Sequence, residues 1–240
     1  MYGEDLAEVY EIVYRSRGKD WGAEAGYVAE LIRERRPDAD SLLDVACGTG
    51  AHLETFDQLF EHTEGLDAAE PMLRLAGRRL PNVTLHKADM REIRLSRSFD
   101  AVTCMFCAIG YLPTPEDMHS AIRSMARHLL PGGVLVVEPW WFPGKHIEGY
   151  VAGDLARENG KTVARISHSR LEGRATRMEV RFLVGEASGI KEFTEIDKIT
   201  LFTHKEYVSA FESAGCSVEY LAGEPTGRGL FIGVRQSLET

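Results

Sequence analysis

Three aspartates and a glycine-rich loop stand at the ends of successive strand-like segments. The loop "ACGTG" spans residues 46–50, and Asp44 lies in the apolar segment just before it. Asp67 and Asp89 end the next two strand-like segments. The carboxyl ends of parallel strands meet at one edge of an open sheet, so we expect these groups around one cleft. Gly48 and Gly50 permit a tight turn that leaves backbone N–H groups facing a ligand.

Three carboxylates favour some ligands over others. They suit ribose hydroxyls, an exocyclic adenine amine beside Met90 and a cationic amino-acid tail better than a pyrophosphate, which they would repel. Asp67 is the candidate for the ribose, Asp89 for the adenine, and Asp44 for the loop or an ammonium group. The GxGxxG spacing of a dinucleotide site is missing, because "AHL" follows Gly50. The alternative is that Asp67 and Asp89 only cap the following helices.

The segments around these residues alternate in type. Apolar periodicity predicts two leading helices and then strands alternating with helices. The strands fall at 41–46, 62–66, 83–87, 100–105 and 134–138, and the helices at 6–16, 21–35, 52–60, 71–80 and 115–130. This alternation predicts an α/β fold with a doubly wound, mostly parallel sheet.

The pattern changes after the fifth strand. Residues 161–171, 174–184 and 190–202 alternate apolar and polar residues, which predicts antiparallel strands. A helix at 205–214 and strands at 218–221 and 229–234 then complete a seven-stranded sheet. We therefore expect a core of residues 1–150 and 203–240 with an antiparallel β insertion at 151–202, serving as a substrate lid and a possible dimer interface.

Composition limits the partners. The 240 residues carry a formal net charge of −9, which argues against binding nucleic acid. The N-terminus is acidic and no apolar run reaches membrane length, so we expect a cytoplasmic protein with no membrane partner. Cys104 and Cys107 form a CxxC without a second ligand pair nearby, so we expect no metal site.

Longer motifs point to a family. "LLDVACGTG", "GLDAAEPML", "KADMREI" and "LLPGGVLVVEP" resemble the class I S-adenosylmethionine-dependent methyltransferases, which have a Rossmann-like fold. "MYGEDLAEVYEIVYRSRGKD", "CMFCAIGYL", "VVEPWWFP", "VARISHSRLEGRATRMEV" and "GEPTGRGLFIGV" resemble, nearly end to end, the sugar N-methyltransferases that finish TDP-linked 3-amino-deoxyhexoses such as desosamine and mycaminose. The resemblance implies the cofactor S-adenosylmethionine, a TDP-amino-deoxyhexose substrate and the addition of two methyl groups in antibiotic deoxysugar biosynthesis.

The resemblance also implies the cofactor and catalytic residues. The cofactor set is Tyr14, Arg17, Ala46, Gly48, Gly50, Asp67, Asp89, Met90 and Met105, with Lys19 as a further candidate for the cofactor carboxylate. Tyr14 and Tyr111 are the catalytic candidates. The resembled family can carry His at the position of Tyr111, so an obligatory base is not expected. We favour orientation of the amine, with loss of its proton to solvent, over a dedicated base.

The substrate set combines aromatic, acidic and basic residues. Glu138 is a candidate for a sugar hydroxyl or the substrate ammonium, and Trp140 and Trp141 for stacking on thymine or packing the lid. His168 and Ser169 are candidates for the nucleotide or its diphosphate. Arg177 and Arg228 are candidates for the diphosphate, because guanidinium groups match phosphate oxygens.

Other functions stay open at this point. O-methylation of a nucleotide sugar or another small molecule is the nearest alternative, since no residue pattern separates an amine from a hydroxyl acceptor. Base and glutamine methylases typically carry an Asn/Asp-Pro-Pro-Tyr run where this chain has "FCAIGYL". A nicotinamide-dependent oxidoreductase lacks its fingerprint here, and a module that binds the cofactor without turnover would yield no S-adenosylhomocysteine. We also expect a homodimer, because the insertion offers an amphipathic sheet.

Overall fold

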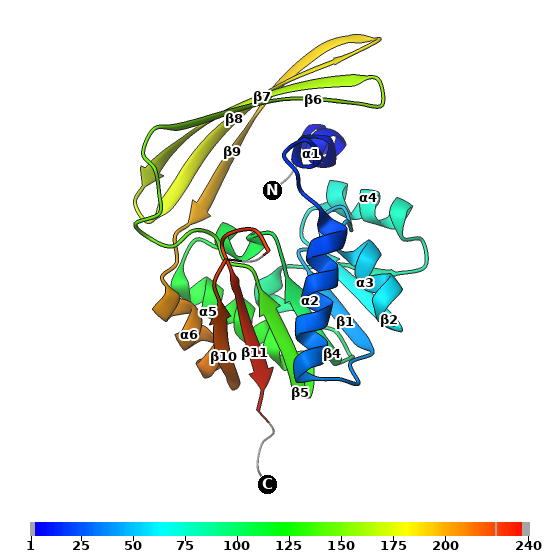
Figure 1. Cartoon of the computed structure of the whole chain (residues 1–240), viewed down its shortest axis with the longest axis vertical. Helices are drawn as coiled ribbons and strands as arrows, with labels where there is room; N and C mark the ends of the chain where they lie inside the picture. The colour runs from blue at the N-terminus through cyan, green and yellow to red at the C-terminus, as the bar shows by residue number, and fades with distance from the viewer. Residues whose placement is uncertain (1–2, 224, 237–240) are drawn as a thin grey trace.

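The computed structural model describes residues 3–223 and 225–236, so residues 1–2, 224 and 237–240 of the expected core lie outside it. A seven-stranded sheet with helices on both faces forms the lower part of the molecule in Figure 1. A four-stranded antiparallel sheet forms the upper part, and the first helix lies beneath it. No helix in the described ranges is long and apolar enough to cross a membrane.

The larger sheet has the order β10-β11-β5-β4-β1-β2-β3. Its strands are β1 (Ser41–Val45), β2 (His62–Asp67), β3 (Thr84–Lys87), β4 (Phe99–Cys104), β5 (Leu129–Val137), β10 (Cys216–Leu221) and β11 (Leu230–Arg235). β1 to β5 pair in parallel, and β11 runs antiparallel to both of its neighbours. β1 and β4 are buried throughout, as expected for central strands covered on both faces. The predicted seven-stranded, mostly parallel sheet is confirmed.

Helices cover both faces of this sheet. α2 (Trp21–Arg35) and α3 (Leu53–Leu59) pack against one face, and α5 (Pro115–Arg127) and α6 (His204–Ser213) pack against the other. The remaining core helices are α4 (Glu70–Arg79) and the short 3₁₀ turns η1 (Met90–Glu92) and η2 (Ala108–Tyr111). The prediction that α5 extends to residue 130 is wrong, because Leu129 already pairs with Phe99 in the sheet.

The insertion forms a meander of four strands. They are β6 (Tyr150–Glu158), β7 (Lys161–Glu172), β8 (Ala175–Glu186) and β9 (Gly189–Thr200). Each strand pairs antiparallel with the next. The sequence predicted only the last three. β6 was missed because it is an edge strand with Ala156 as its one buried residue, which leaves a weak apolar alternation.

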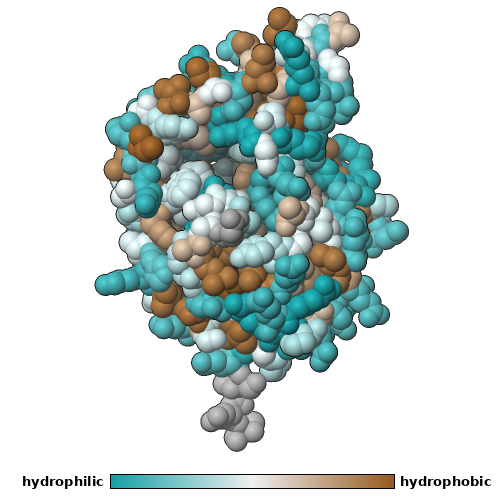
Figure 2. Space-filling model, in the orientation of Figure 1, coloured by the Kyte–Doolittle hydropathy of each residue, from teal (hydrophilic) through white to brown (hydrophobic). Residues whose placement is uncertain are grey.

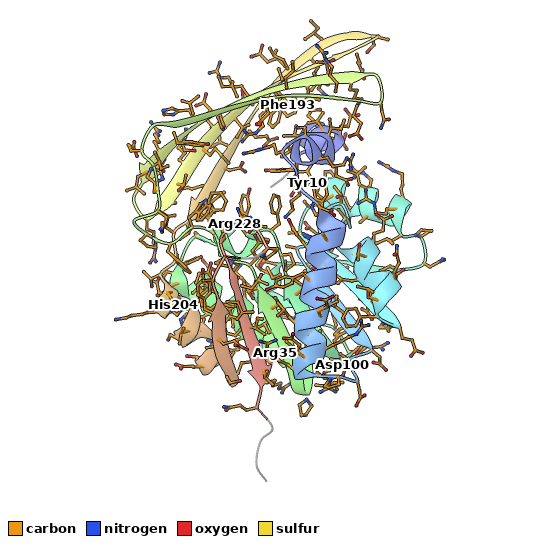
Figure 3. All side chains as sticks on the ribbon, in the orientation of Figure 1. Tyr10, Arg35, Asp100, Phe193, His204 and Arg228 are labelled. Carbon is orange, nitrogen blue, oxygen red and sulfur yellow. The ribbon has the colours of Figure 1, made fainter. Side chains whose placement is uncertain are left out.

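α1 (Glu4–Ser16) joins the two sheets. Its Val9 and Val13 pack against Val163, Val180 and Phe182 on the inner face of the antiparallel sheet. The opposite side of α1 places Ala7 against Ala69 and Met72 at α4. Figure 3 shows Tyr10 at this junction, below the labelled Phe193 of β9. The first helix therefore holds the insertion over the core.

Candidate active site

A cavity of about 800 Å³ lies between the core and the antiparallel sheet. Figure 2 shows a hollow between the upper sheet and the body below it. The cavity is lined from α1 and the turn after it, from the loops that follow β4, β5 and β10, and from the strands β6 to β9 of the insertion. These groups include Tyr14, Arg17, Lys19, Phe106, Tyr111, Trp140, Trp141, Arg165, Ser167, Ser169, Thr176, Met178 and Arg228.

Asp67 fixes the glycine loop that follows β1. One carboxylate oxygen accepts a hydrogen bond from the Gly48 N–H at 2.9 Å, and the other accepts one from the Ala69 N–H at 2.7 Å. Burial raises the pKa of Asp67, although these backbone donors oppose the shift. Gly48 and Gly50 both have positive φ, at 57° and 78°, as the turn requires. Asp67 thus binds both the residue before α4 and the glycine loop. Each carboxylate oxygen can accept more than one hydrogen bond, so these contacts leave Asp67 able to accept from a ligand as well.

Asp44 lies beneath the same loop. It is 1% exposed and accepts a hydrogen bond from the Thr103 hydroxyl at 2.8 Å. Burial raises the pKa of Asp44 to about 6, while the nearby His52 opposes the shift. A carboxylate so poorly solvated favours a cationic ligand group at the loop.

Asp89 occupies the equivalent position after β3. It caps η1 by accepting from the Arg91 N–H at 2.9 Å, and the Arg91 guanidinium also binds it, at 2.6 Å. This pairing lowers the pKa of Asp89, so the carboxylate is ionised. Met90 is half-buried beside it. The structure therefore brings the loop, Asp67 and Asp89 to the ends of three adjacent strands, while Ala46 and Met105 lie at the ends of β1 and β4.

These residues fit S-adenosylmethionine. A methyl group placed on Gly48 would meet no atom within 4 Å, so the loop surface faces open space. Backbone donors, two strand-end carboxylates and the buried acid beneath them match a cationic nucleoside without phosphates. Asp67, Asp89 and the loop would hold such a cofactor, with Arg17 and Lys19 at its amino-acid end.

A buried polar cluster connects the loop to the cavity. Lys19 forms an ion pair with Glu24, and His52 Nε2 lies 2.9 Å from the same carboxylate. The Lys19 ammonium lies 3.8 Å from the centroid of the Phe106 ring, which is a cation–π contact. The Tyr14 ring packs edge-on against Phe106 at 4.9 Å. Glu24 and Phe106 were not among the predicted site residues: Glu24 lies in no quoted motif, and Phe106 lies in "CMFCAIGYL", where only Met105 and Tyr111 were singled out.

Arg228 faces the cavity, and Glu138 lies behind it. Glu138 is fully buried and binds the Arg228 guanidinium at 2.6 Å and the Thr226 hydroxyl at 2.6 Å. Arg228 lies within 6 Å of the rings of Trp140 and Trp141. Figure 3 shows it at the top of the core strands, facing the upper sheet. The structure does not expose Glu138 to a ligand, so we do not retain it as a substrate contact.

The residues predicted in the insertion lie on two opposite faces of its sheet, because side chains alternate along each strand. Ser169 is buried and lines the cavity, whereas His168 is exposed on the opposite face of β7. Arg177 of β8 also lies on that outer face, 3.7 Å from Glu179. We do not retain His168 or Arg177 in the cavity. Their inward-facing neighbours Ser167 and Thr176, missed by the sequence analysis, line it instead.

Tyr111 contacts a carboxylate of the insertion. Its hydroxyl donates a hydrogen bond to Asp197 Oδ1 of β9 at 3.0 Å. Tyr14 of α1 is half-buried nearby, and the charge of Asp197 contributes to raising the pKa of Tyr14, after the larger effect of desolvation. Both catalytic candidates therefore lie next to one acid that the sequence analysis did not single out. The one sequence signal for Asp197 is the alternation of side chains along β9, which places Asp197 on the same inward face as Ile199.

Comparisons with known proteins agree with this geometry. Residues 42–133 match a family model described as a methyltransferase domain. The chain is 54% identical over 235 residues to dTDP-3-amino-3,4,6-trideoxy-alpha-D-glucopyranose N,N-dimethyltransferase from Streptomyces venezuelae, covering 98% of this chain and 99% of that protein. It is 49% identical to dTDP-4-amino-2,3,4,6-tetradeoxy-D-glucose N,N-dimethyltransferase from Saccharopolyspora spinosa, covering 98% and 94%. The chain belongs to the S-adenosylmethionine-dependent sugar N-methyltransferases.

Solved structures of this methyltransferase family share the whole fold. The crystal structure of Streptomyces venezuelae DesVI aligns with a TM-score of 0.94, covering 98% of this chain and 100% of that one at 54% identity. CalS10, an amino pentose methyltransferase from Micromonospora echinaspora solved with S-adenosylmethionine bound, aligns with a TM-score of 0.88 at 57% identity, covering 95% and 97%. The predicted enzyme class and cofactor are thereby confirmed for this methyltransferase.

Proposed function

We propose that this methyltransferase adds two methyl groups to the amine of a dTDP-linked amino-deoxysugar. The observation that supports this most directly is the cavity, which brings Arg228 and two tryptophans together and is connected to the glycine loop through Glu24 and His52. Arg228 suits a diphosphate, and a tryptophan face suits a thymine ring. The relatives named above carry such substrates in their names, with the amine at sugar carbon 3 in one and carbon 4 in the other.

The residues of the chain would act mainly by positioning. When bound, S-adenosylmethionine supplies an electrophilic methyl group on a positively charged sulfur. Asp67 and Asp89 would hold its nucleoside, and Tyr14 would fix the reacting end. Trp140, Trp141, Ser169 and Arg228 would hold the nucleotide sugar, with Tyr111 next to the amine. Alignment of the amine with the methyl group can supply much of the acceleration.

The test is direct turnover. The purified protein is incubated with S-adenosylmethionine and a panel of dTDP-amino-deoxysugars with the amine at carbon 3 or carbon 4, and the sugars are followed by mass spectrometry. Successive gains of one and two methylene masses on the amine are expected for at least one member. If no amine is methylated while a matched dTDP-deoxysugar with only hydroxyl groups gains a methyl group, the protein is an O-methyltransferase.

We also propose that the insertion, residues 151–202, is both the lid of this cavity and a dimer interface. Its inner face supplies Ser167, Ser169 and Thr176 to the cavity. Its outer face carries exposed apolar side chains on all four strands. They are Val151, Leu155, Ile166, Leu183, Ile190 and Ile196, each 48–81% exposed. A patch of this kind on a folded chain favours association with a second copy, which would bury it.

Sedimentation velocity tests the dimer. The wild type is expected to sediment as a dimer, and a Leu155→Asp/Ile166→Asp double variant as a monomer, because it places two charges on the patch. Arg94→Asp changes an exposed residue of the α/β part of the chain, outside the insertion. It is the control and should leave the dimer intact. A monomeric wild type at micromolar concentration would remove the proposal.

A further inference from the structure

Arg79, the last residue of α4, ties the glycine loop to α1. Its guanidinium donates to the Thr49 carbonyl oxygen at 3.1 Å and, through Nη2, to both carboxylate oxygens of Glu11 at 2.8 Å. The Arg79 and Glu11 side chains are 23% and 15% exposed, whereas a further partner of Arg79, Glu54 of α3, is half exposed at 3.4 Å. Burial opposes the ionisation of Glu11, but hydrogen bonds, that from Arg79 first among them, lower its pKa, so the pair is charged. One residue of the core therefore holds the cofactor loop and the first helix together.

The same helix is paired by charge to the insertion. Glu11 also accepts a hydrogen bond from Arg15 at 2.8 Å, and the Arg15 guanidinium binds both carboxylate oxygens of Glu158 in β6, at 2.6 and 3.1 Å. A row of ion pairs thus runs from α4 through α1 to β6. Val9 and Val13 add apolar packing on the inner face of the insertion. α1 and the insertion therefore form one unit.

This unit has a smaller apolar contact with the core. α1 lies between the insertion and α4 (Figure 1). The buried apolar cluster between α1 and the insertion has nine residues, whereas the cluster between α1 and α4 has three, which are Ala7, Ala69 and Met72. Two tyrosine rings of α1 against Phe106 add to the contact with the core. Because burial of apolar surface is the main favourable term, the ion pair at Arg79 carries much of the attachment of α1 to the core.

α1 borders both ligand sites. Glu11 lies beside the glycine loop of the cofactor site, and Tyr14, three residues later on the same helix, lines the cavity. The loop itself packs on α4, since a Cβ atom placed on Gly50 would lie 3.2 Å from the Ala76 Cβ. Arg79 is not among the described residues that line the cavity, and neither is Glu11. A displacement of α1 would therefore open both sites at once, without the loss of any ligand contact by Arg79 itself.

We propose that Arg79 is a positioning residue, which holds α1 and the insertion in their ligand-binding placement by pairing with Glu11. When the pair is broken, α1 is displaced in most molecules, and a ligand binds only after α1 returns. The first ligand that binds then restores the placement, so the second binds more tightly than it does alone. The inference rests on the proposed function for the identity of the second ligand, a dTDP-linked sugar.

The test is calorimetric titration of Arg79→Met with S-adenosylmethionine and with dTDP, the nucleotide part of the proposed substrate, which has no amine to methylate. Each ligand alone should bind about tenfold more weakly than to the wild type, which corresponds to α1 in place in about a tenth of the molecules. With the other ligand at saturation, the affinity should return to within about twofold of the wild-type value. Each ligand should enhance the binding of the other by the same factor.

Two further variants separate the ion pair from a local effect on the loop. Glu11→Gln keeps the Arg79 contact with Thr49 but removes the charge on α1, so it should show the same mutual enhancement of the two ligands. The double variant should bind no more weakly than Arg79→Met, since the two residues act as one unit. Arg74→Met is the matched control. Arg74 also lies on α4 and pairs with Glu4 of α1 at 2.5 Å, but these side chains are 47% and 78% exposed, so both affinities should stay within about twofold of the wild type.

Proteolysis reports the displacement of α1 without the substrate. Residues 17–20 join α1 to α2, and Lys19 is held there by its ion pair with Glu24. Trypsin should cleave this segment about tenfold faster in Arg79→Met than in the wild type or Arg74→Met, because cleavage follows the population of the open form. S-adenosylmethionine at saturation should slow the cleavage of Arg79→Met again.

The outcomes decide the inference separately from the proposed function. If dTDP does not restore the affinity of Arg79→Met for S-adenosylmethionine, or if Glu11→Gln binds both ligands like the wild type, Arg79 acts on the loop alone and the inference is overturned. If Arg79→Met fails to fold, Glu11→Gln carries the same test. Failure of the wild type to bind dTDP would instead remove the proposed substrate. The trypsin rates then decide the inference: faster cleavage in Arg79→Met supports it, and equal rates overturn it.

Discussion

The Arg228 guanidinium and the Glu138 carboxylate form a buried ion pair, with Nη2 and Oε1 2.6 Å apart. Glu138 ends β5, whereas Arg228 lies in the loop between β10 and β11. The second oxygen of Glu138 accepts from the Phe106 N–H at 2.6 Å, and Phe106 has a positive φ of 51°. One carboxylate therefore holds both the strained turn after β4 and the loop that presents Arg228 to the cavity.

Glu138→Gln should destabilise the fold by about 3 kcal/mol, because it leaves the buried Arg228 cation without its counter-charge. Urea unfolding measures this. Glu219→Gln removes the partner of Arg35 at the surface and should cost less than about 1 kcal/mol. If both variants lose similarly little free energy of unfolding, the buried ion pair stabilises the fold no more than a surface ion pair does.

Arg228→Lys should raise the KM for the nucleotide sugar about tenfold while the affinity for S-adenosylmethionine stays unchanged. Lysine keeps the positive charge opposite Glu138 but loses the planar fork that matches phosphate oxygens. Steady-state kinetics with the best substrate of the panel measures it. Arg94→Lys, at an exposed position, is the control. A fall in kcat at constant KM would place Arg228 at the reacting centre instead.

Asp67→Ala should weaken S-adenosylmethionine binding by roughly 1–3 kcal/mol, since buried hydroxyl and N–H groups lose their acceptor. The Gly48 and Ala69 N–H groups already donate hydrogen bonds to this carboxylate. Isothermal titration calorimetry measures the change. Glu70→Gln, in an exposed ion pair at the start of α4, should have no effect. An unchanged affinity in Asp67→Ala would refute its placement at the cofactor.

Asp44→Asn should stabilise the protein without cofactor, and more so at high pH. Burial raises the pKa of Asp44 from 3.8 to about 6, so the folded state binds the proton more tightly than the unfolded state. Stability is therefore lost as the pH rises from about 4 to about 6, and above this range the ionised carboxylate costs about 3 kcal/mol. Asparagine removes this cost and can still accept from Thr103.

Urea unfolding of the Asp44→Asn variant at two pH values measures this effect. The gain over the wild type should be about 3 kcal/mol at pH 8 and about half of that at pH 5. Affinity for S-adenosylmethionine should fall at the same time, because the acid beneath the loop is lost. An equal gain at both pH values would show that ionisation of Asp44 is not its cause. Ser217→Ala, on an exposed strand position, serves as the reference variant.

The order of elements and the cofactor edge could be predicted from the sequence. Strands such as Ser41–Val45 are short apolar runs ended by glycine, and such patterns depend on neighbouring residues alone. Asp67 and Asp89 follow their strands directly, so a parallel sheet brings them together whatever else the chain does. The edge strand β6 escaped because one buried residue in nine leaves no clear alternation.

The cavity side of the insertion required the tertiary structure. In β7, apolar residues lie on both faces, with Val163 buried and Ile166 exposed, so alternation alone cannot tell whether His168 or Ser169 faces the core. That choice depends on how α1 holds the sheet. The pairs Tyr111–Asp197 and Glu138–Arg228 join residues 86 and 90 positions apart. The sequence by itself determined which residues end each core strand, because that is a local property. Only packing of the insertion on the core decided which charges meet, because such contacts depend on the relative placement of two sheets.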